Sequence, residues 1–452
     1  MHIEQSSGDR LASTPSSEPM PAQAGLLAWV FAFWRDHPGV VIFAASLAVR
    51  VVFILAYGAG APPVKWGDDY TYDAIATRLV TKHELEYHWY PLGYTLFLAL
   101  IYGVFGRHWF VVRLLQGALG AATCVLTYRL GTKVFDDRVG RLAGLLLVFY
   151  PGHVYFSWRI MAETLFIFLL MWALNIAIRL ARRPALREAV ALGLIVGVAQ
   201  LVKSNLYVFP ALLVAWSALA LRGSIRRRLA LACGLAGSFL LVSLITPVGN
   251  FLSIGGGASV LPGVAGRTLW TANNPLADGY SLGAESEPAG KAFIEAHGLT
   301  ARLAQADEFE KDRLFLDLGL AWIRENPGRF LVLCLKKLNN AFGLFPHAAT
   351  FEGSRTTQAV HLFSYGLIAP FALVGMIATR RRHWLICAPL FLVLLSYVSM
   401  VLLFYGTPRF TVIVMPVLIV FASSALWTCA DHFARTDPAL GKLIRRLGKE
   451  GR

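Results

Sequence analysis

Residues 38–58 read PGVVIFAASLAVRVVFILAYG, a stretch whose one charged side chain is Arg50. A segment of about 20 mainly apolar residues is long enough to cross the roughly 30 Å hydrocarbon core of a bilayer as a helix. Directly after it, residues 66–73 read WGDDYTYD and concentrate carboxylates and aromatic rings. The two segments together predict a first membrane span that is followed by charged residues at its far end. Arg50 lies near the middle of that span and needs a partner inside the protein.

The composition of the whole chain agrees with a membrane protein. Of its 452 residues, 56% are hydrophobic and 15% are charged, whereas soluble domains contain about 45–50% apolar and about 25% charged residues. A water-soluble enzyme is therefore excluded. The net charge of +15 comes from short basic clusters between apolar segments, which is typical of cytoplasmic membrane loops. Nucleic acid is not an expected partner, and membrane lipids are.

The order of apolar and basic segments predicts the topology. Ten apolar segments are credible spans: 38–58, 110–131, 139–157, 161–180, 188–203, 205–221, 229–248, 361–379, 384–404 and 410–430. Basic clusters, which mark cytoplasmic loops, occur at 129–141, 179–187, 222–228, 380–382 and 445–446. They share one side with the N-terminus only if two further apolar stretches, 91–106 and 330–345, are interfacial helices that do not cross.

These segments predict an all-α polytopic membrane protein with both termini in the cytoplasm. Residues 1–25 are interpreted as a disordered cytoplasmic tail, and residues 431–452 as a basic cytoplasmic tail. The membrane domain covers 26–430, and residues 249–328 form an outer cap loop over it. The expected location is the inner (plasma) membrane, with the active site facing the periplasm or the exterior.

Two adjacent carboxylates, Asp68 and Asp69, are the strongest candidates for chemistry. Neighbouring carboxylates repel, and a low-dielectric interface raises the pKa of at least one of them, which suits a group that accepts a proton. A base at this place would deprotonate an acceptor hydroxyl. The alternative is that both residues only cap a helix that begins near Tyr70, because Asp is favoured in the first turn of a helix.

Several cations are predicted at the outer ends of spans. Lys203 and Arg409 have no acid partner nearby in the sequence, so they are candidates for binding a phosphate, or else they snorkel to lipid headgroups. Arg113 opens a span, and charges so close to hydrocarbon are usually paired or functional. Arg159 and Glu163 flank the start of another span, where they could also form a local i, i+4 salt bridge.

The remaining polar candidates are weaker. Asn273 and Asn274 lie beside Trp270, and amides next to aromatic rings are suited to holding a sugar, although Asn-Pro is also a common turn. The histidines and the five cysteines have no metal-ligand spacing. Neither a metal nor another cofactor is therefore expected.

Taken together, these residues resemble the GT-C polytopic glycosyltransferases of the family 39 type. That family includes the bacterial aminoarabinose transferases of lipid A and, more distantly, the protein O-mannosyltransferases. The resemblance runs from about residue 38 to about residue 430. It is carried by Asp68-Asp69 with Tyr72, Tyr90-Pro91-Leu92-Gly93-Tyr94, Arg113-Leu114, Pro151 to Glu163, Leu269 to Pro275, Glu325 to Phe330, and Pro408-Arg409-Phe410.

The resemblance implies transfer of a sugar from a polyprenyl-phosphate donor to a lipid, glycan or protein acceptor on the outer face, with inversion at the anomeric carbon. It implies that Asp68 is the catalytic base and Asp69 supports it. Lys203, Arg409 and Arg113 are the implied donor-phosphate and loop-organising cations. The implied supporting or acceptor-binding residues are Tyr72, Tyr90, Arg159, Glu163, Asn273 and Asn274.

The chain departs from the aminoarabinose transferases beside the acidic pair, and its sequence leaves one alternative function open. The aminoarabinose transferases have an arginine just after the acidic pair, where Thr71 stands here, so specificity for that sugar is not implied. The alternative function is a polytopic transporter or lipid flippase, which would place ionisable residues near the midplane of several spans. Apart from Arg50, the middle of the spans is nearly free of charge, which favours the enzyme.

Overall fold

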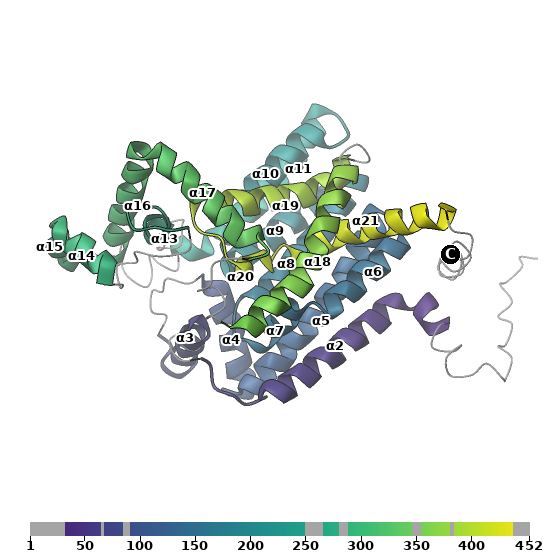
Figure 1. The fold of residues 1–452 in the computed structure, drawn as a ribbon, viewed down its shortest axis with the longest axis horizontal. Coiled ribbons are helices and arrows are strands. Elements are labelled where there is room, and N and C mark those ends of the chain that lie inside the picture. Colours follow the sequence, from purple (N-terminus) through teal and green to yellow (C-terminus); the bar gives the residue numbers. More distant parts are fainter. Residues whose placement is uncertain are drawn as a thin grey trace, which may run out of the picture.

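The structure is a computed structural model that describes residues 32–64, 67–84, 91–248, 265–279, 288–345, 354–379 and 384–436. Every regular element in these ranges is a helix (Figure 1), which confirms the predicted all-α fold. The helices are α2 (Pro38–Tyr57), α3 (Asp68–Lys82), α4 (Leu92–Phe105), α5 (Trp109–Val134), α6 (Asp137–Val148), α7 (Pro151–Trp158), α8 (Glu163–Arg182), α9 (Leu186–Val202), α10 (Phe209–Ala220), α11 (Ile225–Ser243), α13 (Ala265–Ala272), α14 (Pro288–Ala296), α15 (Thr300–Gln305), α16 (Glu308–Glu325), α17 (Pro327–Phe342), α18 (Arg355–Thr379), α19 (Trp384–Leu403), α20 (Pro408–Thr411) and α21 (Met415–Thr436).

All ten predicted spans coincide with helices, but they are unequal in length. Seven helices among the described residues are long and apolar enough to cross a membrane, and the bent pair α6 and α7 makes up to eight. The two other predicted spans, α9 with 17 residues and α10 with 12 residues, are shorter than the usual span. The stretches predicted to be interfacial form α4 and α17. The chain is therefore a multi-pass membrane protein.

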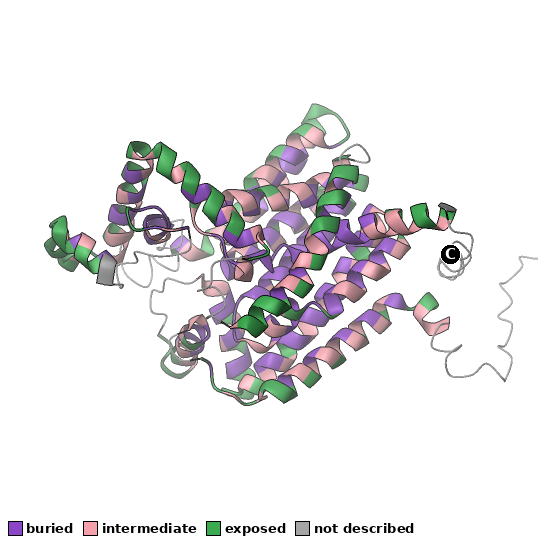
Figure 2. Cartoon of the chain, in the orientation of Figure 1, coloured by how far each residue is buried: buried purple, intermediate pink, exposed green. Residues whose placement is uncertain are grey.

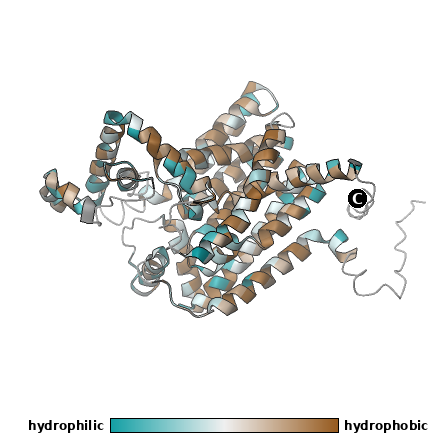
Figure 3. Cartoon of the chain, viewed as in Figure 1, coloured by the Kyte–Doolittle hydropathy of each residue, from teal (hydrophilic) through white to brown (hydrophobic). Residues whose placement is uncertain are grey.

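The surface of the bundle is that of a protein surrounded by lipid. Large apolar side chains stay exposed along its helices, for example Leu55, Leu219 and Ile377, which are 59%, 75% and 67% exposed. Exposed residues recur along the helices of the bundle (Figure 2), and many residues of these helices are hydrophobic, whereas hydrophilic residues are frequent on α3 and α16 (Figure 3). Exposed apolar area of this extent marks contact with a membrane or a partner.

Close contacts between backbones hold the bundle together. A Cβ atom at Gly193 in α9 would lie 2.2 Å from the carbonyl oxygen of Leu235 in α11. In the same way, a Cβ atom at Gly375 in α18 would lie 2.0 Å from the carbonyl oxygen of Phe421 in α21. Small residues allow helices to approach closely where lipid supplies no hydrophobic driving force between them. These two glycines therefore set the distances between two helix pairs.

The ends of the bundle differ in character. The start of α2 and the end of α21 lie at one end of the molecule, and α3 and the cap helices α13 to α16 lie at the opposite end (Figure 1). In the cap, Asp312 of α16 accepts hydrogen bonds from the first backbone N–H groups of α13, at 3.1 Å from Gly266 and 3.0 Å from Arg267. Within the predicted cap loop, residues 288–325 thus form α14 to α16, which pack with α13.

Parts of the predicted domain organisation lie outside the described residues. These parts are the tail 1–25, residues 249–264 and 280–287 of the cap loop, and residues 437–452 of the basic tail. Helix α21 extends to Thr436, beyond the boundary at 430 predicted from the sequence.

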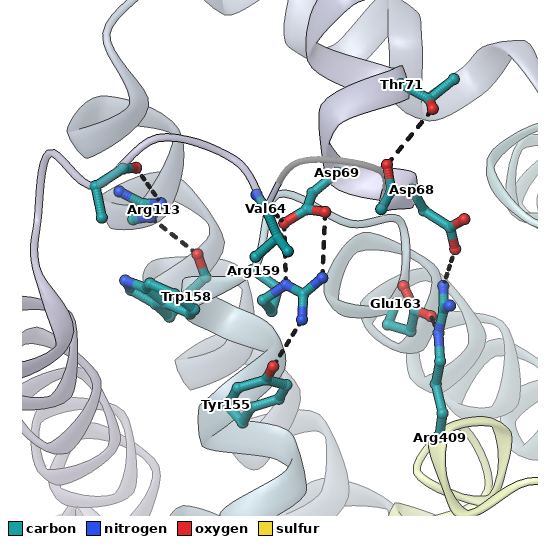
Figure 4. Close-up of polar contacts among 12 residues, drawn as sticks. Val64, Asp68, Asp69, Thr71, Arg113, Tyr155, Trp158, Arg159, Glu163 and Arg409 are labelled. Carbon is teal, nitrogen blue, oxygen red and sulfur yellow. Dashed lines mark hydrogen bonds and ion pairs between the residues drawn. The ribbon is translucent and has the colours of Figure 1, made fainter. Parts of the chain in front are cut away.

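The span predicted at 139–157 is broken, and the break positions the site. α6 and α7 meet at an angle of 52°, and Pro151 at the start of α7 supplies a preset backbone angle and no N–H donor. The short helix α7 ends at Trp158, so that Arg159 leaves it in an extended conformation. This residue then points at the loop before α3 (Figure 4).

Candidate active site

Four charged side chains from four separate elements form one ion cluster, which we define as Asp68, Glu163, Lys203 and Arg409. Asp68 is the first residue of α3 and Glu163 the first of α8, Lys203 follows α9, and Arg409 lies in α20. Arg409 Nη2 lies 2.5 Å from Asp68 Oδ2, and Arg409 Nε donates to Glu163 Oε1 at 2.7 Å. Lys203 Nζ donates to the same Oε1 at 3.3 Å. Figure 4 shows Arg409 between the two carboxylates.

The ion cluster runs from the interior to the surface. The Glu163 side chain is fully buried, whereas the side chains of Asp68 and Arg409 are 27% and 33% exposed. Burial by itself lowers the pKa of Arg409, but the carboxylates of Glu163 and Asp68 outweigh burial and raise that pKa above its usual value. Arg409 therefore stays charged. The sequence predicted two cations without a nearby acid; the structure supplies the acid through Glu163.

Asp69, next to Asp68 in the chain, is held in a different way. Both of its carboxylate oxygens accept from Arg159, each at 3.1 Å, and Oδ2 also accepts from the backbone N–H of Val64 at 3.1 Å (Figure 4). Arg159 donates in addition to the hydroxyl of Tyr155 at 2.7 Å. A forked guanidinium pair of this kind fixes the orientation of a carboxylate. Each of the two acidic residues thus has its own arginine, so their mutual repulsion is compensated.

The two simpler interpretations of these residues have different outcomes. No side chain caps α3, whose N-cap is Gly67, but Asp68 and Asp69 do lie in its first turn, where carboxylates are favoured. Both residues also pair with arginines from other elements, so helix initiation is not their one role. Arg159 pairs with Asp69 and not with Glu163, so the i, i+4 salt bridge predicted as an alternative does not form.

Arg113 is a buried organiser of the first outer loop. Its guanidinium donates to the carbonyl oxygens of Gly58, Ala59 and Ala61 at 3.3, 2.7 and 2.7 Å, and to that of Trp158 at 3.0 Å. These four carbonyl groups occupy the donors that a phosphate would need. We therefore leave Arg113 out of the proposed phosphate site and keep the loop-organising role that the resemblance implied.

Gln116 is a positioning residue that the sequence analysis missed. Its amide nitrogen donates to the carbonyl oxygens of Ser157 and Arg159 at 3.1 and 2.7 Å, and its Oε1 accepts from Tyr94 at 2.5 Å. Gln116 thus ties α4 and α5 to the end of α7, directly behind Arg159. A glutamine inside an apolar span is costly unless it is partnered, and this signal was available in the sequence.

Asp73 is a second anchor, one turn beyond the acidic pair in α3. It accepts from Tyr102 at 2.6 Å and from Trp109 at 2.9 Å, and it forms an ion pair with Arg107 at 2.5 Å. The Asp73 side chain is almost completely buried. These contacts attach α3 to the turn between α4 and α5, so the helix that carries Asp68 is fixed at its middle as well as at its start.

A separate polar group lies inside the bundle, and we call it the Arg50 cluster: Arg50, Ser46, Cys124, His153 and Ser157. Arg50 is completely buried, and it donates to the Ser46 hydroxyl, to Ser157 Oγ at 3.1 Å and to His153 Nδ1 at 2.6 Å. Because an arginine only donates, the Nδ1 atom of His153 accepts, and the ring proton is on Nε2. The partner that the sequence demanded for Arg50 is therefore a set of neutral groups.

The other predicted supporting residues lie in different surroundings. Tyr72 is buried and packs edge-to-face against Tyr94 at 4.8 Å between ring centroids, and Tyr90 lies outside the described residues. Asn273 and Asn274 are buried, and their amide nitrogens donate to backbone carbonyl groups, including that of Leu403 at 2.7 Å. These contacts connect the cap to α19 and leave the acceptor-binding prediction for both asparagines without support.

Lys337 of α17 lies beside this connection. Its Nζ donates to Asn273 Oδ1 at 2.7 Å and to the carbonyl oxygens of Leu402 and Leu403 at 3.2 and 3.5 Å. It thereby satisfies carbonyl groups that a helix leaves open at its C-terminus. Burial lowers the pKa of Lys337 to about 8. In the part of the chain that the structure describes, no group of three or more His, Cys, Asp or Glu residues could hold a metal ion.

Comparison with known proteins shows which fold this is. Residues 90–248 match the family model of dolichyl-phosphate-mannose-protein mannosyltransferase. The chain is also similar to the archaeal oligosaccharyltransferase AglB from Archaeoglobus fulgidus, solved with an inhibitory peptide and a dolichol-phosphate. That similarity has a TM-score of 0.51 and 12% sequence identity, and it covers 91% of this chain and 52% of AglB. The chain has a GT-C fold.

Further structures extend this comparison. The A. fulgidus oligosaccharyltransferase tethered to an acceptor peptide matches with a TM-score of 0.50 and 13% identity, over 91% of this chain and 52% of that one. ArnT from Cupriavidus metallidurans, bound to undecaprenyl phosphate, has a TM-score of 0.36 and 18% identity, over 91% and 81%. No curated protein sequence matches the chain.

The family match and the shared fold confirm the resemblance predicted from the sequence. The GT-C chain spans about half the length of the oligosaccharyltransferases that it matches. The match to a mannosyltransferase family model favours the transferase over the transporter or flippase that the sequence left as an alternative.

Proposed function

We propose that this GT-C protein is a membrane glycosyltransferase that moves a sugar from a polyprenyl-phosphate donor to a hydroxyl group of a lipid, glycan or protein acceptor. One geometric observation carries this function: the Asp68 carboxylate lies at Arg409, which Glu163 connects to Lys203. A proton acceptor and two cations thus meet in one partly exposed cluster. The family model that matches residues 90–248 supports the same reaction class.

The proposed roles follow from the two environments of the acidic pair. Asp69 has both oxygens on Arg159, so its role is to position the loop. Asp68 is more exposed, and we assign it as the base that takes the proton from the acceptor hydroxyl. The hydroxyl oxygen then forms a bond to the anomeric carbon of the sugar, and the bond from that carbon to the phosphate oxygen breaks.

Lys203 and Arg409 are the residues assigned to the phosphate. As the bond to the sugar breaks, negative charge develops on the leaving polyprenyl phosphate, and cations placed beforehand at that position stabilise it. Because the acceptor attacks from the face opposite the phosphate, the reaction inverts the anomeric centre. We further propose that this end of the bundle faces the periplasm or the exterior and that both termini are cytoplasmic. The positions of the basic clusters support this orientation.

The test compares glycolipids and glycoproteins, by mass spectrometry, from cells that contain the protein and cells that lack it. A sugar-sized mass that is absent without the protein names both donor sugar and acceptor. Wild-type protein must restore that mass, and the Asp68→Asn variant must not restore it. Identical glycoconjugates in both cells would contradict the proposed function.

A further inference from the structure

Glu163 is the buried carboxylate on which the two proposed phosphate-binding cations converge. Its Oε1 accepts from both Lys203 and Arg409. Its Oε2 is also buried, and it has no hydrogen-bond partner among the described residues. A buried acceptor without a partner is costly. A counter-ion that served only to stabilise the fold would be expected to use both oxygens.

Lys203 and Arg409 each have N–H donors that form no hydrogen bond with the described residues. An ammonium group has three donors, and within the described part of the chain Lys203 Nζ has Glu163 as its one hydrogen-bond partner. Arg409 uses Nε for Glu163 and Nη2 for Asp68, and its Nη1 forms no hydrogen bond or ion pair among the described residues. Both residues therefore keep donors that an incoming anion can accept from, while Glu163 occupies part of their capacity.

The charges of the ion cluster add up to zero. Asp68 and Glu163 each carry one negative charge, and Lys203 and Arg409 each carry one positive charge. A polyprenyl-phosphate sugar is a phosphodiester with one negative charge, whereas a released phosphate monoester carries about −1.5 to −2 at neutral pH. Any site that attracts the donor phosphate therefore attracts the product phosphate more strongly. Such a site needs a way to release its product.

We propose that Glu163 supplies this release: it competes with the lipid phosphate for Lys203 and Arg409, and so it weakens binding of the phosphate product. This inference rests on the proposed function. Glu163 neutralises the cations when the site is empty, and it repels the extra charge of the product. It is a positioning residue for the two cations and touches no reacting atom.

The experiment measures the affinity of the full-length protein in nanodiscs for a polyprenyl phosphate, with the uncharged polyprenol of equal length as reference. Glu163→Gln keeps the shape of the side chain and removes its charge. We expect this variant to bind the polyprenyl phosphate about tenfold more tightly than wild type, because a negative charge next to the ligand is gone. Binding of the polyprenol stays unchanged.

Glu188→Gln is the matched control. Glu188 is also a carboxylate with an arginine partner, Arg179, at 3.0 Å, but it lies in the first turn of α9, whereas Lys203 follows the other end of that helix. This variant is expected to bind the polyprenyl phosphate like wild type. If Glu163→Gln binds as weakly as or more weakly than Glu188→Gln, Glu163 is a structural counter-ion and the inference is wrong.

A double variant keeps the test decisive if Glu163→Gln does not fold. Lys203→Gln alone leaves the cluster with excess negative charge and is expected to bind the polyprenyl phosphate at least tenfold more weakly than wild type. Combining it with Glu163→Gln restores the charge balance, and we expect the affinity to return toward the wild-type value. A double variant no better than Lys203→Gln would contradict the role of Glu163.

Turnover adds a second readout. If product release is slowed, Glu163→Gln lowers both kcat and the KM for the donor, and the first turnover appears as a burst. A purely structural role would raise KM without a burst. The inference and the proposed function fail in distinguishable ways. If wild type does not prefer the polyprenyl phosphate over the polyprenol, the function fails; if it does and Glu163→Gln gains no affinity, the inference alone fails.

Discussion

The ion cluster and the Arg50 cluster both bury cations, but their partners differ. In the ion cluster, carboxylates from α3 and α8 face Lys203 and Arg409, and part of the cluster is open to solvent. In the Arg50 cluster, the guanidinium is completely buried among hydroxyl groups, a neutral imidazole, a thiol and a backbone carbonyl.

This difference indicates that the ion cluster can bind a ligand, whereas the Arg50 cluster stabilises the fold. A cation held by carboxylates can exchange one anionic partner for another when a charged ligand arrives. A cation held by neutral groups that belong to three packed helices cannot do so without loss of packing. The packing around Arg50 is tight. A Cβ atom at Gly120 would lie 2.5 Å from Arg50 Nε and 2.8 Å from Ser157 Oγ. We therefore expect changes in the ion cluster to alter activity, and changes in the Arg50 cluster to alter stability.

The largest expected effect is that of Asp68→Asn on sugar transfer. General base catalysis contributes about 10²–10⁴-fold to a rate, so the transfer rate of the purified protein should fall by at least about 100-fold. Glu84→Gln, which removes an exposed carboxylate just after α3, is the control and should retain full activity. Transfer by Asp68→Asn at the wild-type rate would remove Asp68 from the mechanism.

The second-largest expected effect is that of Arg50→Leu on stability. Arg50→Leu leaves the buried groups of Ser46, Ser157 and His153 without their donor, and each unsatisfied buried polar group costs about 1–3 kcal/mol. We expect a loss of about 3 kcal/mol in the free energy of unfolding, measured as a lower Tm in nanodiscs. Arg324→Leu, at an exposed position of α16, should leave the Tm unchanged. An unchanged Tm in Arg50→Leu would break the distinction between the two clusters.

The third prediction compares the neighbours Asp68 and Asp69. Asp69→Asn keeps the shape of the side chain but weakens its charged pair with Arg159, so the loop before α3 loses part of its anchor. Because Asp69 positions and does not react, we expect the transfer rate to fall by about tenfold, which is the effect of about 1.4 kcal/mol. The same assay measures both variants. Equal losses for Asp68→Asn and Asp69→Asn would mean that the two carboxylates act as one unit.

The smallest effect concerns Lys337, another buried cation with neutral partners. Burial lowers its pKa from 10.5 to about 8, so between pH 8 and 10 the unfolded chain holds a proton that the folded protein has released. Stability therefore rises with pH in this window. The free energy of unfolding of wild type, relative to Lys337→Met, should increase by about 1 kcal/mol from pH 9 to pH 10. A difference that is constant or falls with pH would contradict a lowered pKa.

Much of the fold could be predicted from the sequence. All ten predicted spans are helices, because a run of apolar residues of sufficient length has to form its hydrogen bonds within itself in a bilayer. The break in the span at 139–157 was missed, although Pro151 marks it. The shortness of α10 was missed too, because hydropathy measures how apolar a segment is and not where its helix ends.

The residues of the candidate site could be predicted from the sequence, but the ion pairs between them could not. Asp68, Lys203, Arg409 and Glu163 were all singled out, since charges at the edge of apolar segments are rare and costly. Their partners were not, because Glu163 is 40 residues from Lys203 and 246 residues from Arg409, and Asp69 is 90 residues from Arg159. The spacing of residues along the chain does not indicate contacts between residues so far apart in the sequence.

Read along the chain, the amino acids specify a helical membrane protein whose charged residues gather at the ends of its spans, since hydrophobic length and the cost of burying charge act along the chain. Which carboxylate meets which cation depends on tertiary packing. So do the fixed position of Asp69, the partial exposure of Asp68 and the neutral partners of Arg50, because ion pairs and hydrogen bonds form through space. The packing of α3, α7, α8, α9 and α20 sets these distances.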